Sequence, residues 1–252
     1  MRRQYELTQQ KNPHALTIRQ HVYPSKGISR FCNPNGKRER VQIFDKTRQK
    51  SRPAAPDDAI FCGKRVWDQR AESGYMKDIE DAFQALACQV INGFVTDIDE
   101  EQKKTVDAFF ALWRMRADYR CSQSTEISLN AVTGGDWTQD QEERFESCGV
   151  LFVRSGGKLP ARMLYGLRIQ SGIDDYVDQL ASVRWGILKA VEGHLVVPDF
   201  PAYMIIPLTP TLCLCSGGRS GILDPSSLLE INRGFRATSV EYFFAQDLDR
   251  CP

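Results

Sequence analysis

Four side chains have the types and settings that could do chemistry. His21 lies near the turn-forming Pro24, and an imidazole that titrates near neutrality can act as a general base or a metal ligand. Asp45 and Lys46 end a short strand, where a carboxylate that holds Mg²⁺ or Mn²⁺ and an ammonium that steadies a phosphate are typical of metal-dependent nucleases. Asp199 lies in a proline-rigid loop, which suits a ligand or a base. We therefore assign catalytic roles to all four and metal ligation to Asp45 and Asp199.

Each of these residues also has a structural interpretation. A histidine can pack under a loop with its ring bonded to backbone, and Asp and Lys are both common in the turn after an edge strand. An aspartate between prolines can accept hydrogen bonds from local N–H groups in an Asx turn. A nuclease would also need a second acid beside Asp45, for which Glu80 is the better candidate and Glu39 the weaker. Both interpretations stay open at this point.

Charge is divided unevenly along the chain. The first 75 residues carry 16 Lys and Arg against 7 Asp and Glu, and the remaining 177 carry 17 against 25. The formal net charge of +1 therefore combines a basic head with an acidic body. A basic region attracts phosphates and an acidic one repels them, so the head is the part expected to meet an anionic partner.

A cluster of cations in the head surrounds an Asn-Gly turn and the short strand after it, with aromatic side chains interleaved. This pattern predicts phosphate contacts that alternate with stacking platforms for bases. The cluster could instead be a solvated face, dock on the chain's own acidic segment 97–101, or bind an acidic protein partner. The predicted nucleic-acid contacts are Lys37, Arg38, Arg40, Arg48, Lys50 and Arg52.

Composition and motifs exclude several classes of protein. No apolar run approaches 18 residues, so we expect no membrane span. The first residues lack an apolar signal-peptide core, and eight cysteines without an export signal predict reduced thiols in a cytoplasmic protein. Cys213 and Cys215 share one face of a strand and form no zinc knuckle. The glycine-rich segment 216–221 lacks the Gly-Lys-Ser/Thr ending of a phosphate loop, and we find no Gly-x-Ser-x-Gly elbow.

Periodicity divides the chain into helices and strands. Apolar residues recur every three or four positions in two neighbouring stretches, which predicts an αα-hairpin, whereas β-branched runs towards both ends predict strands. We expect helices over 75–91, 97–117, 137–147, 160–170 and 228–244. We expect strands over 41–45, 204–206 and 212–215, and hairpins that join 60–62 to 66–67 and 183–191 to 194–197.

These elements predict an α+β fold: a mixed or antiparallel sheet built from N-terminal hairpins and C-terminal strands around a central helical layer. Joining both ends of the chain in one sheet would bring His21, Asp45 and Asp199 near each other. We expect one domain over 1–252, made of the basic strand and loop head 1–75, a helical middle 76–180, and a β-rich then helical end 181–252.

Three segments, in order along nearly the whole chain, carry a recognisable series of motifs. The first is a Gln-His-x-x-Pro run from Gln20 that reaches Phe31, and the second is the short strand that ends in Asp-Lys. The third contains Asp199-Phe200-Pro201, followed by Pro-Leu-Thr-Pro and later by Glu-Ile-Asn. Together they resemble the domain-of-unknown-function family 4238 of bacteria and their phages, whose members usually have Asp-Asn-Pro in place of Asp-Phe-Pro. The resemblance implies no transferable activity, but it suggests a toxin, defence or counter-defence role.

The sequence thus favours a cytoplasmic bacterial or phage protein that acts on nucleic acid through its basic head, as a metal-dependent phosphodiesterase with Mg²⁺ or Mn²⁺. The main alternative is a non-catalytic interaction module, such as an inhibitor or a subunit of a defence complex with a protein partner. A third hypothesis is an enzyme that acts on a nucleotide or small molecule. The sequence leaves open whether the protein is an enzyme.

Overall fold

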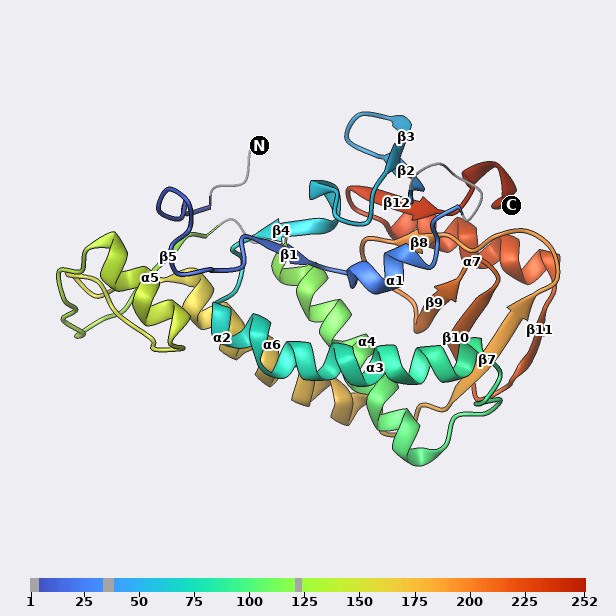
Figure 1. Ribbon diagram of the computed structural model, residues 1–252. Helices are drawn as coiled ribbons and strands as arrows, with labels where there is room; N and C mark the ends of the chain where they lie inside the picture. Colours follow the sequence, from blue (N-terminus) through green and yellow to red (C-terminus); the bar gives the residue numbers. More distant parts are fainter. Residues whose placement is uncertain (1–4, 34–38, 121–123) are drawn as a thin grey trace.

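The computed structural model describes residues 5–33, 39–120 and 124–252. Three long helices run through the centre of the molecule, with one sheet above them and a second sheet beside them in Figure 1. A smaller lobe at the left of the same view holds α5 (Gln139–Ser147), β5 (Glu126–Ser128) and β6 (Lys158–Pro160). The predicted α+β class is confirmed.

The upper sheet joins the two ends of the chain. Its order is β3 (Lys50–Ala54), β2 (Val41–Asp45), β12 (Tyr242–Ala245) and β8 (Val197–Pro198), and every neighbouring pair is antiparallel. Alternation of side chains sends Val41 and Ile43 into the core. On the other face, the Phe44 ring stacks on the Phe243 ring with centroids 5.1 Å apart. The expected union of N-terminal and C-terminal strands is therefore confirmed.

The second sheet is mixed and is built from the C-terminal part of the chain. Its order is β11 (Gly221–Leu223), β7 (Trp185–Ala190), β10 (Leu212–Ser216) and β9 (Ile205–Thr209), with β11 parallel to β7 and the other pairs antiparallel. The predicted hairpin of 183–191 with 194–197 is wrong. After the turn at Gly193 the chain leaves this sheet and enters the upper one as β8.

The central layer contains α3 (Tyr75–Ile91), α4 (Glu100–Arg120) and α6 (Ala161–Gln179). The predicted αα-hairpin is confirmed, and the Phe83 and Phe109 rings stack between its helices with centroids 3.6 Å apart. Helix α6 continues nine residues past the predicted end at 170, because Ile169 and Ile173 keep an apolar stripe against α4 and α2.

The end of the chain differs from the prediction. A helix was expected over 228–244, but α7 (Pro225–Thr238) stops at Thr238 and β12 follows. Asp224 caps α7 by accepting hydrogen bonds from the N–H groups of Ser226 and Ser227. Aromatic residues in a row favour a strand, and β2 offers an open edge for one. Tertiary pairing therefore overrides the helical pattern in the last segment.

Short elements complete the head and the linkers. β1 (Arg19–His21) pairs with β4 (Cys62–Lys64), so the predicted hairpin of 60–62 with 66–67 is wrong. The remaining elements are α1 (Ser25–Ser29), η1 (Ala59–Phe61), α2 (Gln69–Ser73) and η2 (Leu248–Arg250). In the described ranges, no helix has the length and apolar character needed to cross a membrane.

Tyr23 ties the head to the C-terminal sheet. Its ring is buried and contacts the rings of Phe109 and Trp113 on α4 and Phe244 on β12. Its hydroxyl donates a hydrogen bond of 2.7 Å to the Pro207 carbonyl oxygen, 184 positions away in sequence. One side chain therefore contacts the central helices and both sheets.

We predict that Tyr23→Phe lowers the free energy of unfolding by about 1–2 kcal/mol, because it leaves a buried carbonyl without its donor while the ring packing stays. Urea denaturation measures the change. Tyr203→Phe, at a position whose side chain is largely exposed, is the matched control and should change stability by less than about 0.5 kcal/mol. Equal effects of the two substitutions would contradict this role of the Tyr23 hydroxyl.

Candidate functional site

Asp45 organises the turn between β2 and β3. Its Oδ1 accepts hydrogen bonds from the Thr47 N–H at 3.0 Å, the Thr47 hydroxyl at 2.6 Å and the Arg48 N–H at 3.0 Å. Burial raises the pKa of Asp45, but the hydrogen bonds from Thr47 and Arg48 outweigh it, and the pKa lies below its usual value. The carboxylate is thus used as an Asx-type acceptor within its own hairpin.

Lys46 closes the C-terminal end of α7. Its Nζ donates to the carbonyl oxygens of Arg236 at 3.0 Å and Ser239 at 2.5 Å. An ammonium there satisfies carbonyls that lack an intrahelical partner and lies at the negative end of the helix dipole. The structure gives Lys46 a capping role across 190 positions of sequence.

Asp199 holds the start of β12. Its buried carboxylate accepts hydrogen bonds from three successive N–H groups: Val240 at 2.8 Å, Glu241 at 2.7 Å and Tyr242 at 3.2 Å. Burial raises the pKa of Asp199, and these hydrogen bonds offset part of the rise. Of the two interpretations of this residue, the backbone-capping one matches the geometry.

The fold brings the two predicted metal ligands to the same sheet without joining them. Asp45 is the register partner of Tyr242 on one side of β12, and Asp199 bonds Tyr242 from the other side. Two strand spacings separate their backbones by roughly 10 Å. In the described part of the chain, no three His, Cys, Asp or Glu residues form a group that could hold a metal ion. Both carboxylates accept hydrogen bonds from backbone N–H groups, and their assignment as metal ligands stays a prediction.

His21 lies apart from this pair. It is on β1, in the separate two-stranded sheet, and its half-buried ring bonds the Pro56 carbonyl oxygen through Nε2 at 3.0 Å. The predicted second acid, Glu80, pairs with Arg116 on α4. Within the described residues His21 thus forms no bond to Asp45, Lys46 or Asp199, and each of the four bonds backbone groups.

The predicted nucleic-acid contacts lie on or beside the β2–β3 hairpin. The Arg48 side chain is 76% exposed at the hairpin tip, and Lys50 is exposed beside it. Arg40 is half-buried, and Arg52 forms a two-pronged ion pair with Asp58 at 2.7 and 2.9 Å. Two further predicted contacts, Lys37 and Arg38, lie outside the described residues. Arg48 and Lys50 are therefore the predicted contacts that the structure shows exposed.

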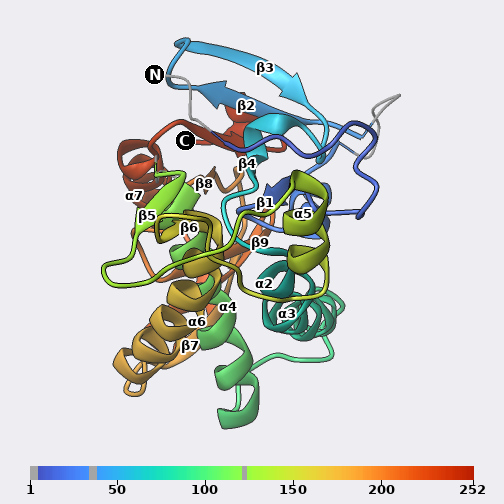
Figure 2. The same ribbon diagram turned by 90° about the vertical axis from the view of Figure 1, so that its left-hand side faces the viewer.

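The basic hairpin does not dock on the acidic turn between α3 and α4. Figures 1 and 2 are related by rotation about the vertical axis, and in both the hairpin is at the top and this turn is at the bottom. Glu100 instead pairs with Arg184, and Glu101 pairs with Lys104 at 2.8 Å. The alternative in which the hairpin cations Arg48, Lys50 and Arg52 neutralise segment 97–101 is wrong.

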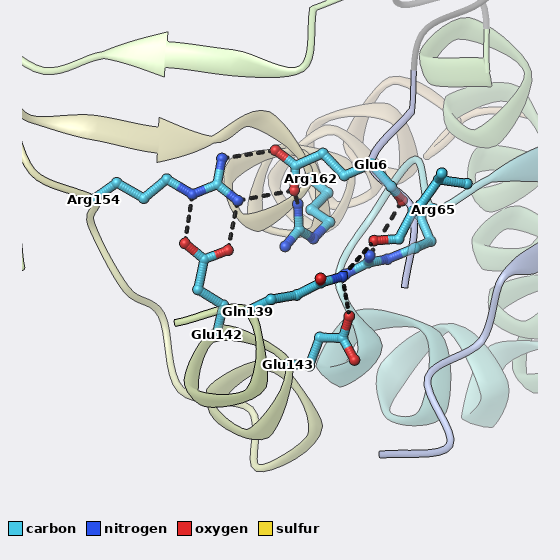
Figure 3. A pocket seen from close by; sticks show the side chains of 8 residues that line it. Glu6, Arg65, Gln139, Glu142, Glu143, Arg154 and Arg162 are labelled. Atoms are coloured by element: carbon cyan, nitrogen blue, oxygen red, sulfur yellow. Dashed lines mark hydrogen bonds and ion pairs between the residues drawn. The ribbon is translucent and has the colours of Figure 1, made fainter. Parts of the chain in front are cut away.

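A polar cleft of about 300 Å³ lies between the lobe and the head. Figure 3 shows its walls: charged side chains from α5, from the start of α6 and from the N-terminal segment converge on one another. We call it the arginine–glutamate cleft. Its lining residues are Glu6, Leu7, Arg65, Gln139, Glu142, Glu143, Arg154 and Arg162.

Arg154 is the most heavily paired residue of the cleft. Its guanidinium donates to both carboxylate oxygens of Glu142 at 2.6 Å and to both oxygens of Glu6 at 2.7 and 3.0 Å. It also reaches Glu126 at 3.0 Å. The hydrogen bonds that Arg154 donates to Glu142 and then to Glu6 raise the pKa of Arg154 further above its usual value, so Arg154 is a fixed positive charge.

A second set of ion pairs, centred on Glu146, lies next to those of Arg154. The Glu146 carboxylate is buried and accepts hydrogen bonds from Arg65 at 2.6 Å and Arg162 at 2.8 Å. Arg162 also bonds Glu6. Burial raises the pKa of Glu6, but the pairs with Arg154 and Arg162 outweigh it, so this pKa lies below its usual value. Glu6 therefore bridges two arginines as an anion.

Local sequence explains how α5 presents its acids. Thr138 and Gln141 form a capping box that starts the helix. Glu142 and Glu146 are four residues apart and so lie on one face of α5. Sequence reasoning missed the cleft because its arginines, at 65, 154 and 162, are far in sequence from Glu6. The Glu-x-x-x-Glu spacing of α5 was its only local signal.

The lining of the cleft suits recognition of a charged group. Its polar side chains are carboxylates, guanidinium groups and one amide. Five of its charged residues are already paired in fixed geometry: Glu6, Arg65, Glu142, Arg154 and Arg162. The arrangement can recognise a group by charge and shape.

Comparisons with protein-family models, curated proteins and solved structures found no match. The resemblance to family 4238 therefore stays a prediction from the motifs. The motif residues have clear structural roles here: Gln20 bonds the backbone of Val66 and Trp67, and Asn232 bonds the backbone of His194 and Val196.

We predict that Asp199→Ala lowers the free energy of unfolding by about 2–4 kcal/mol, because three N–H groups lose a charged acceptor. Urea denaturation measures the change. Asp249→Ala, at an exposed position in the same C-terminal region, is the control and should be nearly neutral. An Asp199→Ala protein as stable as the parent would contradict the structural role.

Asp68 is a buried carboxyl close to the cleft. Its Oδ1 has no hydrogen-bond partner within the described residues, and its nearest cation is Arg70 at 3.5 Å. Burial raises the pKa of Asp68 to about 6, despite the opposing charge of Arg70. Because the folded pKa is raised, ionised Asp68 costs stability above pH 6, and the cost disappears as the pH falls towards 4.

We therefore predict that Asp68→Asn raises the free energy of unfolding by about 1–3 kcal/mol at pH 8. The gain should shrink between pH 6 and pH 4, where the parent carboxyl takes up a proton. Denaturation curves at several pH values measure the difference. A gain that does not vary with pH would show that Asp68 is not ionised and penalised in the folded state.

Proposed function

We propose that the protein binds nucleic acid through the tip of the β2–β3 hairpin, without catalysis at His21, Asp45, Lys46 or Asp199. The observation that carries the proposal is the segregation of charge: an exposed basic tip at one end of the molecule and the acidic α3–α4 turn at the other. Such a dipolar surface orients the molecule towards a polyanion with its basic end first.

Charge at the tip supports this assignment. Between Asp45 and Lys50 the turn contains three cations and one acid, and the acid is buried and saturated with hydrogen bonds. Arg48 lies 3.7 Å from Asp45, a long pair that leaves most of its guanidinium in water. Exposed cations on a projecting hairpin can reach phosphates with little rearrangement.

The binding role also accounts for the residues first assigned to chemistry. Asp45 shapes the hairpin turn and Lys46 fixes its base to α7, so both hold the tip in position. We further propose, on the motif resemblance, a cytoplasmic protein of a bacterium or phage that works in defence or counter-defence. Cutting of nucleic acid is not needed for such a role.

We predict that the double variant Arg48→Ala/Lys50→Ala binds labelled single-stranded RNA or DNA at least about 10-fold more weakly than the parent at low salt. The slope of log affinity against log salt should become shallower by about 1–2, because a protein that makes fewer phosphate contacts releases fewer counterions when it binds. Fluorescence anisotropy measures both. Binding should be unchanged by a chelator, and Mg²⁺ or Mn²⁺ should produce no cleavage.

Lys189→Ala/Arg219→Ala is the matched control, because it removes two exposed cations from the second sheet and its adjoining loop. If this control weakens binding as much as the hairpin variant, the contact is not at the hairpin. Metal-dependent cleavage that Asp45→Ala abolishes would restore the phosphodiesterase interpretation instead.

A further inference from the structure

We infer that the arginine–glutamate cleft is a binding site for a peptide segment that presents a carboxylate, filled here by the chain's own N-terminal residues and open to exchange with a partner protein. We call residues 5–14 the strap. This inference is independent of nucleic-acid binding, because the cleft and the hairpin tip share no residue.

The cleft recognises a carboxylate in fixed geometry. Arg154 meets the two oxygens of Glu6 with two separate N–H donors, and Arg162 bonds the same carboxylate. Figure 3 shows Glu6 between these guanidinium groups, with Glu142 bracing Arg154 from the opposite side. Two-pronged pairing of this kind selects a planar carboxylate and depends on arginine, because lysine cannot reproduce the fork.

Backbone contacts make the site specific for a peptide. Arg65 donates to the Glu6 carbonyl oxygen at 3.2 Å, and Gln139 donates to the Leu7 carbonyl oxygen at 3.0 Å. Glu143 accepts the Gln9 N–H at 2.7 Å. A free inorganic anion has no N–H to donate to Glu143, so the ligand that fits is an extended chain with a glutamate or aspartate.

Acids outnumber arginines around the cleft, which limits the negative charge that a ligand can add. Three arginines (65, 154 and 162) meet Glu142 and Glu146 from α5, and two of them, Arg154 and Arg162, also pair with Glu6. Glu126 touches Arg154 from a more exposed position, and Glu143 takes the strap's N–H group. A phosphate dianion would add excess negative charge among these acids. The balance therefore favours a carboxylate over a phosphoryl group.

The strap is attached mainly by polar contacts, so another peptide could replace it in the cleft. None of its residues is fully buried; Leu7 is 70% exposed, and the first buried residue of the described chain is Leu16. Lys11 in the strap has φ of 67° and Ala15, just after it, has φ of 51°, a left-handed conformation that costs non-glycine residues about 1–2 kcal/mol each. The strap therefore stays in place through polar contacts that another acidic segment can replace.

Arg65 supplies an observation independent of the strap. Its side chain is 97% buried, yet its Nε has no hydrogen-bond partner in the described residues, and it lines the cleft. A buried cationic N–H without an acceptor is costly. Arg65 therefore lines the cleft with one N–H donor that the strap leaves without an acceptor.

The test uses full-length protein and a fluorescein-labelled peptide with the sequence of residues 5–14. In the variant Glu6→Gln the strap loses its charge, so the labelled peptide should bind at least 10-fold more tightly to this variant than to the parent. A peptide with Gln in place of its Glu should bind at least 10-fold more weakly to the variant. Fluorescence anisotropy measures both affinities.

A second substitution tests the two-pronged ion pair between Arg154 and the carboxylate. Adding Arg154→Lys to Glu6→Gln should weaken peptide binding at least 10-fold, because charge remains but two-pronged pairing is lost. Arg184→Lys, which pairs with the distant Glu100, is the control and should leave binding unchanged. Equal binding of the Glu and Gln peptides, or no binding to a Glu6→Gln protein that melts like the parent, overturns the inference.

If the Glu6→Gln variant does not fold, the same test is made on the parent protein. A saturating amount of the peptide with the sequence of residues 5–14 should displace the strap. It should therefore speed hydrogen exchange of the strap amides and leave exchange in β2 unchanged. Strap exchange unaffected by the peptide overturns the inference.

Discussion

Antiparallel pairing of β2 with β12 is the constraint on which the rest of the structure depends. It joins residues 41–45 to residues 242–245, so the chain must return to its start before the upper sheet exists. Loop closure over this length is costly in entropy. Long-range hydrogen bonds from the buried Tyr23 and the half-buried Lys46 help to offset that cost.

The polar residues of the upper sheet are best understood as partners of backbone. At strand ends and helix ends, N–H and C=O groups lack a ladder or intrahelical partner, and burial makes an unpaired group expensive. Asp199 serves three N–H groups and Lys46 serves two carbonyls. The residue types that suit catalysis also suit this task, which is why sequence reasoning assigned them a nuclease role.

Charge in this protein is used in two ways. At the hairpin tip, cations stay in water and are available to a partner, whereas in the arginine–glutamate cleft the pairs are enclosed and fix geometry. Arg65 and Arg48 both belong to the basic head, yet one is buried against Glu146 and the other is exposed. Buried pairs add more to specificity than to stability, which suits a recognition site.

The sequence by itself determined the local elements and the charge split, because periodicity, caps and turns act over a few residues. It predicted α3, α4 and β2 closely and the meeting of both chain ends in one sheet. Tertiary structure alone decided that 242–245 form a strand, that Asp45 and Asp199 serve backbone, and that the cleft exists. Those outcomes depend on partners far apart in the chain, such as Glu6 and Arg162, 156 positions apart, and no local pattern encodes such pairings.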